Sequence, residues 1–246
     1  MIVFCHLIAA IYIASLLLRA WLALKFSASL PEPSKSSPPA GALTVMQAIL
    51  SGDPRLEERL MENLASLPGQ HFLWLLDEDD FEAIRITEKL CQDDVRLVLC
   101  PPCPELANPK IWKLRQGFPL IETAFLAVVD DDTALSGESA QALIAGLERA
   151  SIATGLPCYL DSGNLPSRLV AQFVNNHSVF TYLGTSFLIL PFTLNGMGYA
   201  MRREELERLG GFGAILSELT DDLALATLAL NRGGTLHQSR APLLIH

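Results

Sequence analysis

The chain has 246 residues, of which 50% are hydrophobic and 18% are charged, so it can bury one sizeable core or two small ones. Its formal net charge is −9, and residues 43–246 carry 15 basic and 26 acidic side chains. Nucleic-acid readers need a basic face, so this balance argues against nucleic acid as a partner. The acidity instead suits contact with anions through a metal ion.

The N-terminal segment is strongly apolar. Residues 1–24, MIVFCHLIAAIYIASLLLRAWLAL, are interrupted only by His6 and Arg19. At about 1.5 Å per residue, a helix of this length crosses a hydrocarbon core of roughly 30 Å. We therefore expect a transmembrane signal-anchor over residues 1–26.

The charges around this segment bear on its orientation. No Lys or Arg precedes the apolar run, whereas Arg19, Lys25 and Lys35 lie toward its end or beyond it. The positive-inside tendency then predicts a single-pass membrane protein with the rest of the chain on the cytoplasmic side. A cleaved signal peptide and a buried core helix are the alternatives.

A linker and a strand–helix alternation follow. Residues 27–42 are rich in Ser and Pro and are expected to form a linker, so the globular domain is expected over residues 43–246. Between short apolar runs lie helical stretches, one of them with Leu56, Leu60, Leu64 and Leu67 on one face. This alternation predicts an α/β fold with a mostly parallel sheet covered on both faces. The predicted strands are residues 43–50, 71–77, 95–100 and 124–130.

Acidic residues follow several of these predicted strands. Ligands of open parallel sheets bind at the carboxyl ends of the strands. Asp77 ends the second run, and Asp130, Asp131 and Asp132 end the fourth. A D-x-D pattern in this position suits Mg²⁺ or Mn²⁺, which takes one or two protein carboxylates and fills its remaining positions with water and phosphate oxygens. A solvated acidic turn is the alternative.

The second half of the chain is less regular. Helices are predicted over residues 137–150 and 203–212, and a strand over 151–160. Residues 165–192 form a mixed apolar stretch, either core or a surface against a bilayer. A last helix follows, predicted to place its apolar face on Leu219, Leu223, Ala226 and Leu230. Asp221 and Asp222 lie in its first turn, where the helix dipole alone can account for them.

Two of the five cysteines form the sequence CPPC. These are Cys100 and Cys103, at the end of the third predicted strand. A redox pair would normally open a helix after a strand, whereas Pro101, Pro102 and Pro104 break this segment. The prolines therefore favour reduced loop cysteines over a redox or metal pair.

Six segments in order resemble one enzyme family. They are ILSGDPRL, LLDEDD, NPKIWKL, VVDDDT, NGMGYAMRREELERLGGF and LTDDLALATL, and they extend from about Leu43 toward the end of the chain. Together they resemble the ceramide glucosyltransferase-type glycosyltransferases, family 21 within the broader family 2 group. The resemblance implies a GT-A fold, a nucleotide-sugar donor that is UDP-linked, a lipid acceptor and inversion at the anomeric carbon.

The resemblance also implies residue roles. Asp77, Asn108, Lys110 and Asp130 match donor-binding positions, and Asp130 with Asp132 matches the metal site for Mg²⁺ or Mn²⁺. Asp222 matches the general base that takes the proton of the acceptor hydroxyl, and Asp221 is the alternative base.

The end of the chain departs from the family pattern. The family's Gln/Arg-x-x-Arg-Trp segment and the membrane segments after it have no counterpart before His246. We therefore expect either a fragment of a longer protein or a shortened member whose acceptor part is incomplete, and a binding module without turnover is an alternative to an enzyme. An unrelated α/β protein with acidic loops is the remaining alternative.

Overall fold

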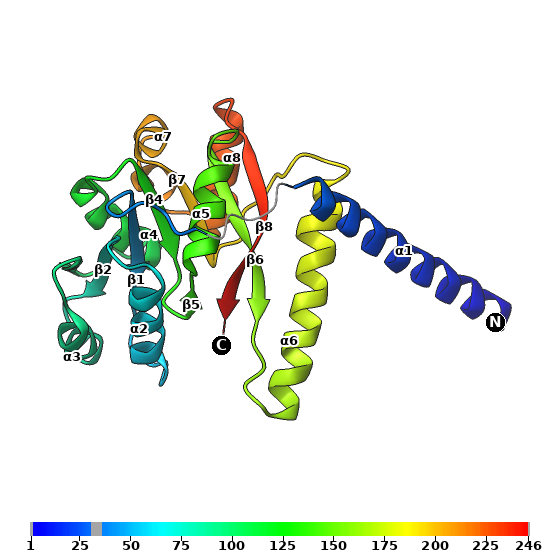
Figure 1. Ribbon diagram of the computed structural model, residues 1–246, viewed down its shortest axis with the longest axis horizontal. Helices are drawn as coiled ribbons and strands as arrows, with labels where there is room; N and C mark the ends of the chain where they lie inside the picture. Colours follow the sequence, from blue (N-terminus) through cyan, green and yellow to red (C-terminus); the bar gives the residue numbers. More distant parts are fainter. Residues whose placement is uncertain (1, 31–35, 246) are drawn as a thin grey trace.

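The protein consists of an α/β unit from which one long N-terminal helix projects (Figure 1). The computed structural model describes residues 2–30 and 36–245. The strands in chain order are β1 (Leu43–Ala48), β2 (His71–Asp77), β3 (Val95–Cys100), β4 (Phe125–Val129), β5 (Thr133–Ala134), β6 (Ile152–Tyr159), β7 (Gly198–Arg202) and β8 (Leu236–Ile245). The α-helices are α1 (Ile2–Ser29), α2 (Leu56–Ser66), α3 (Phe81–Leu90), α4 (Pro109–Gly117), α5 (Gly137–Gly146), α6 (Leu165–Ser178), α7 (Arg203–Arg208) and α8 (Asp221–Asn231).

Within residues 36–245 the strands form one eight-stranded sheet in the order β3-β2-β1-β4-β7-β6-β8-β5. The four strands predicted from the sequence, β1 to β4, are parallel neighbours, which confirms that part of the prediction. β7 pairs antiparallel with both β4 and β6, and β8 pairs parallel with β6. The sheet is therefore mixed, and its parallel half carries the strand ends that matter for the site.

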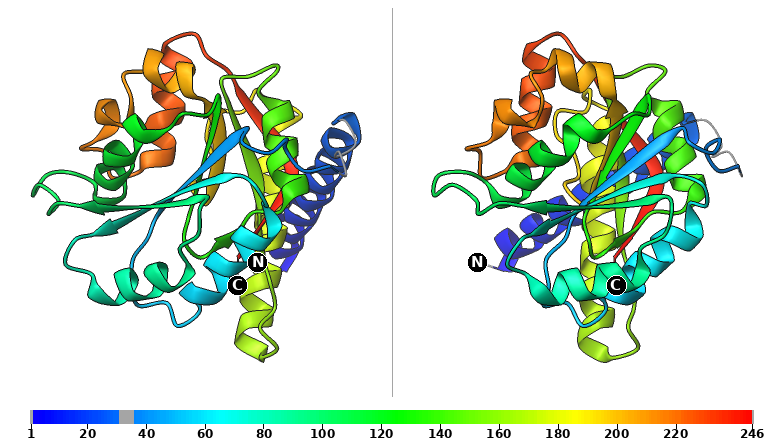
Figure 2. Two further views of the ribbon diagram at one scale, coloured as in Figure 1. Left: turned by 60° about the vertical axis from the view of Figure 1, so that its left-hand side comes forward. Right: turned by 90° about the vertical axis from the view of Figure 1, so that its left-hand side faces the viewer.

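Both faces of the sheet are covered, which explains the continuous apolar runs of its strands. Side chains of successive residues in a strand point to opposite faces. Met46 and Leu75 accordingly pack in the core beneath α4 and α8, whereas Val45 and Trp74 pack in the core beneath α2 and α5. Figure 2 shows the sheet between these two helical layers.

The prediction for the buried face of α8 was wrong in part. Leu219 precedes the helix and is 96% exposed, and Leu223 is also exposed. The buried residues are Leu225, Ala226 and Ala229. Because α8 is apolar on nearly all sides, its sequence periodicity alone could not select the face that packs.

The N-terminal helix α1 extends three residues beyond the predicted anchor. It is long and apolar enough to cross a membrane, and most of its large apolar side chains are exposed, which argues against a buried core helix. Only its C-terminal part packs on the α/β unit, where Leu22 and Ala23 are buried.

The predicted linker lies partly outside the described residues, which omit 31–35. Its last residues contact the α/β unit. The carbonyl of Pro39 accepts a hydrogen bond from the Gln70 side chain at 2.9 Å, and the Gly41 N–H donates to the Gly69 carbonyl at 2.8 Å.

Candidate active site

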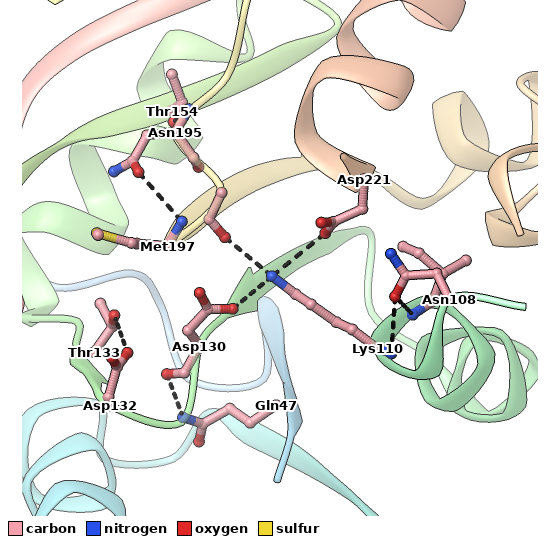
Figure 3. A network of polar contacts seen from close by, with 12 residues as sticks. Gln47, Asn108, Lys110, Asp130, Asp132, Thr133, Thr154, Asn195, Met197 and Asp221 are labelled. Atoms are coloured by element: carbon pink, nitrogen blue, oxygen red, sulfur yellow. Dashed lines mark hydrogen bonds and ion pairs between the residues drawn. The ribbon is translucent and has the colours of Figure 1, made fainter. Parts of the chain in front are cut away.

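Residues from α4, β4 and α8 meet at the carboxyl edge of the parallel strands. Lys110 lies between two acids (Figure 3): its Nζ is 2.5 Å from Asp130 Oδ1 and 3.4 Å from Asp221 Oδ2. The same ammonium donates to the carbonyl of Gly196 at 3.2 Å. The structure thus brings together three residues that the sequence analysis selected from distant segments.

Asn108 fixes the position of Lys110 by capping α4. Its side-chain oxygen accepts hydrogen bonds from the backbone N–H groups of Lys110 at 3.0 Å and Ile111 at 3.3 Å. Pro109 occupies the first helical position, where its missing N–H costs nothing. The Asn108 Nδ2 donates to the Glu218 carbonyl at 2.9 Å. Asn108 therefore joins the start of α4 to the segment before α8, and its predicted contact with a donor stays a prediction.

Asp77 pairs with a lysine that the sequence analysis missed. The Nζ of Lys113 lies 2.8 Å from Asp77 Oδ2 and donates to the Ile49 carbonyl, also at 2.8 Å. Lys113 is three residues after Lys110, so both point from one face of α4 toward the sheet edge. A second lysine three residues after Lys110, on a helix near an acid at a strand end, was the sequence signal that could have identified Lys113.

The three acids after β4 make different contacts. Asp130 binds Lys110, and Asp131 accepts a hydrogen bond from the Leu50 N–H at 2.9 Å. Asp132 accepts one from the Thr133 hydroxyl at 3.0 Å. The turn is closed by the Thr133 N–H, which donates to the Asp130 carbonyl at 3.1 Å. Asp131 thus ties this turn to the loop after β1, which separates its role from those of Asp130 and Asp132.

Burial and crowding of negative charge perturb these groups. Burial raises the pKa of Asp130 despite the attraction of Lys110, and burial together with its acidic neighbours raises the pKa of Asp131 to about 6. Burial by itself lowers the pKa of Lys110, but Asp130 and Asp221 outweigh it, so that pKa is raised. Lys110 is therefore charged and faces more than one carboxylate.

The acids offer oxygen ligands only, which suits Mg²⁺ or Mn²⁺. Across residues 2–30 and 36–245 no group of three or more His, Cys, Asp or Glu side chains is arranged to hold a metal ion by itself. One or two carboxylates suffice when substrate phosphate supplies the remaining ligands. Asp130 and Asp132 therefore fit such an ion in ligand chemistry.

Asp222 lies beside the loop before β7. Its Oδ1 accepts a hydrogen bond from the Leu223 N–H at 2.7 Å. A Cβ at Gly196 would lie 3.2 Å from Oδ2 of Asp222, so a side chain there would crowd the acid. Burial, and secondarily the negative charge of Asp222, raises the pKa of Tyr182. Gly196 thus borders Asp222 and has a packing reason to lack a side chain.

The two cysteines of the CPPC sequence were predicted to be reduced loop residues, but Cys100 is the last residue of β3 and only Cys103 lies in the loop after it. Cys100 and Cys103 are free. Burial raises the pKa of Cys100 to about 11, which disfavours the thiolate that redox or metal chemistry needs.

Comparisons with known proteins agree with this architecture. The mannosyltransferase PcManGT from Pyrobaculum calidifontis, solved in complex with GDP-Man and Mn²⁺, superposes with a TM-score of 0.65 at 15% sequence identity. The match covers 96% of this chain and 66% of that one, and at this identity it establishes a shared GT-A-like fold. The search of curated proteins found no match. The family described as Glycosyl transferase family 21 matches residues 1–245, so the chain belongs to glycosyl transferase family 21.

Proposed function

We propose that this protein is a membrane-anchored, inverting glycosyltransferase that moves a sugar from a nucleotide diphosphate, UDP-linked by family resemblance, to a lipid hydroxyl. The observation that carries the proposal is Lys110, which joins the acids after β4 to the start of α8. Donor-side and acceptor-side groups, far apart in sequence, therefore form one cluster.

The donor side would be formed by α4 and the turn after β4. The ammonium of Lys110, which here contacts Asp130, Asp221 and the Gly196 carbonyl, would exchange one of these contacts for a diphosphate oxygen. Asp130 and Asp132 would hold Mg²⁺ or Mn²⁺, which offsets the charge of a leaving diphosphate. Asp77 and Lys113 lie at the same sheet edge and would border the nucleotide.

The acceptor side would be formed by α8 and the loop around Gly196. Asp222 Oδ1 is bound to the Leu223 N–H, which leaves Oδ2 for the acceptor. In the proposed reaction this carboxylate takes the acceptor proton, the acceptor oxygen bonds to the anomeric carbon, and the bond from that carbon to phosphate breaks on the opposite face. Asp222 lies in the first turn of α8, at the positive end of the helix dipole.

The anchor and the acceptor class rest on α1 and on the family resemblance. α1 has the length and apolarity of a membrane span, and the family resemblance implies a lipid acceptor. The basic residues Arg19 and Lys25 support a cytoplasmic position for the α/β unit.

Donor binding tests the proposal directly. We would titrate the full-length chain in detergent with UDP-sugars and GDP-mannose, with Mn²⁺ or with EDTA. Binding should require the cation, and Asp132→Ala should weaken it by about tenfold or more, about 1.4 kcal/mol. Asp93→Ala removes an exposed acid before β3, at the opposite edge of the sheet, and is the matched control. Cation-independent binding, or equal effects of the two variants, would contradict the donor site.

Product analysis then separates an enzyme from a binding module. Membranes that contain the full-length chain are supplied with labelled nucleotide sugars, and lipids are extracted and separated. Labelled lipid supports transfer. Cation-dependent binding without labelled lipid would support the non-catalytic alternative.

A further inference from the structure

Helix α6 turns an apolar face away from the protein. Its inner face is held to β6, where the Asn175 side chain both accepts from the Tyr159 N–H at 2.7 Å and donates to the Tyr159 carbonyl at 2.9 Å. The opposite face exposes Leu165, Leu169 and Phe173, spaced four residues apart. Phe173 is the most exposed of the three, at 74%. A soluble helix normally places such residues inward.

The segment after α6 extends this apolar surface. Residues 179–184 continue as a π-helical turn, and residues 187–192 expose five large apolar side chains. These are Phe187, Leu188, Ile189, Leu190 and Phe192. Residues 179–194 contain no charged side chain. We call the exposed apolar residues of 165–173 and 187–192 the α6 surface. The density of exposed large apolar side chains in these two ranges distinguishes it from scattered surface apolar residues.

The α6 surface adjoins α1. Trp21 of α1 meets Phe187 edge to face, with ring centroids 6.3 Å apart. Gly184 lies against the α1 backbone, since a Cβ there would be 3.3 Å from the Arg19 carbonyl. In Figure 1, α1 leads away from the α/β unit while α6 runs across that direction on the same side of the molecule. A bilayer crossed by α1 would therefore extend along α6.

We propose that the α6 surface is a second membrane contact, lying in the interface of the bilayer that α1 spans. This inference rests on the proposed membrane anchor. The occupant we assign is the apolar boundary of the lipid leaflet, because the surface is continuous with the anchor and nearly uncharged. Arg168, the cation within residues 165–173, is paired with Asp161 at 3.0 Å. The contact is therefore hydrophobic, and raised salt should leave it unchanged.

The position of the α6 surface has a consequence for the acceptor. Gly196 follows the α6 surface closely in sequence, four residues after Phe192. Its carbonyl accepts a hydrogen bond from Lys110, and its Cα lies beside Asp222. The proposed base would thus lie next to the leaflet that supplies a lipid hydroxyl.

Quenching by doxyl-labelled lipid tests the contact on the full-length chain. Each of three variants adds one tryptophan at an exposed position, in neutral phosphatidylcholine vesicles, and is compared with the unmodified chain. Phe173→Trp probes the α6 surface, Leu17→Trp probes α1, and Phe81→Trp is the matched control at 78% exposed on α3. Figure 1 shows α3 at the far end of the sheet from α1.

We expect the tryptophan at 173 to be quenched about twofold or more relative to the one at 81, at low and high salt alike. If the tryptophan at 17 is quenched and those at 173 and 81 behave alike, the α6 surface does not touch lipid and the inference fails while the anchor stands. If the tryptophan at 17 is not quenched, the anchor fails and the inference with it. None of these readouts depends on donor binding or transfer.

Discussion

Lys110 neutralises acids that would otherwise repel one another at the candidate active site. Replacing it by methionine keeps the apolar stem but leaves Asp130 and Asp221 without their ammonium partner. Breaking a fully buried ion pair costs about 3–5 kcal/mol, whereas an exposed pair contributes roughly 0–1 kcal/mol.

The exposure of the three side chains sets the expected size of the effect. Lys110, Asp130 and Asp221 are 25%, 31% and 17% exposed, so solvent screens part of the loss. We expect Lys110→Met to lower the free energy of unfolding by about 2 kcal/mol. In an α/β unit of this size that lowers Tm by about 4–8 °C.

The assay is thermal unfolding of the full-length chain in detergent, followed by the fluorescence of buried Trp74. Lys89→Met is the matched control, because Lys89 pairs with Glu57 at a mostly exposed site and its loss should cost less than about 1 kcal/mol. Equal Tm losses in the two variants would refute the idea that Lys110 holds the acids together.

Three further predictions concern neighbouring residues. Asp131→Asn should stabilise the metal-free protein by about 2 kcal/mol at pH 7. The raised pKa of Asp131 means that the folded state holds its proton up to about pH 6, so the stability of the unmodified chain falls as pH rises between about 4 and 6. Urea unfolding curves should therefore show that the gain in the variant vanishes below about pH 4. Asn108→Ala should lower the free energy of unfolding by about 1–2 kcal/mol in the same assay, because the α4 cap is lost. Asn108→Asp keeps a capping oxygen and should retain most of the stability, so equal losses in the two variants would contradict the capping role. Asp222→Asn should abolish lipid labelling while cation-dependent donor binding stays within about twofold, and a variant that still transfers would remove Asp222 as the base.

Local sequence pattern was sufficient for the parallel half of the sheet. The strands at 71–77 and 95–100 were predicted with their observed bounds, because each is a short apolar run bounded by polar residues. The acids at strand ends followed from the same pattern, since parallel strands bring their carboxyl ends to one edge. The N-terminal helix was also predicted from local pattern, because its apolar run is long enough to cross a bilayer as a helix.

Contacts between distant segments decided the rest. The pairing of β8 with β6 joins residues more than eighty positions apart, and no local period announces it. The same holds for Lys113 with Asp77, for the contact of Asp131 with the loop after β1, and for the buried face of α8. Sequence periodicity shows which residues are apolar along one element, but the direction each face takes depends on what the folded chain packs against it. On α6 that packing holds Asn175 against β6 and leaves Leu169 and Phe173 facing outward.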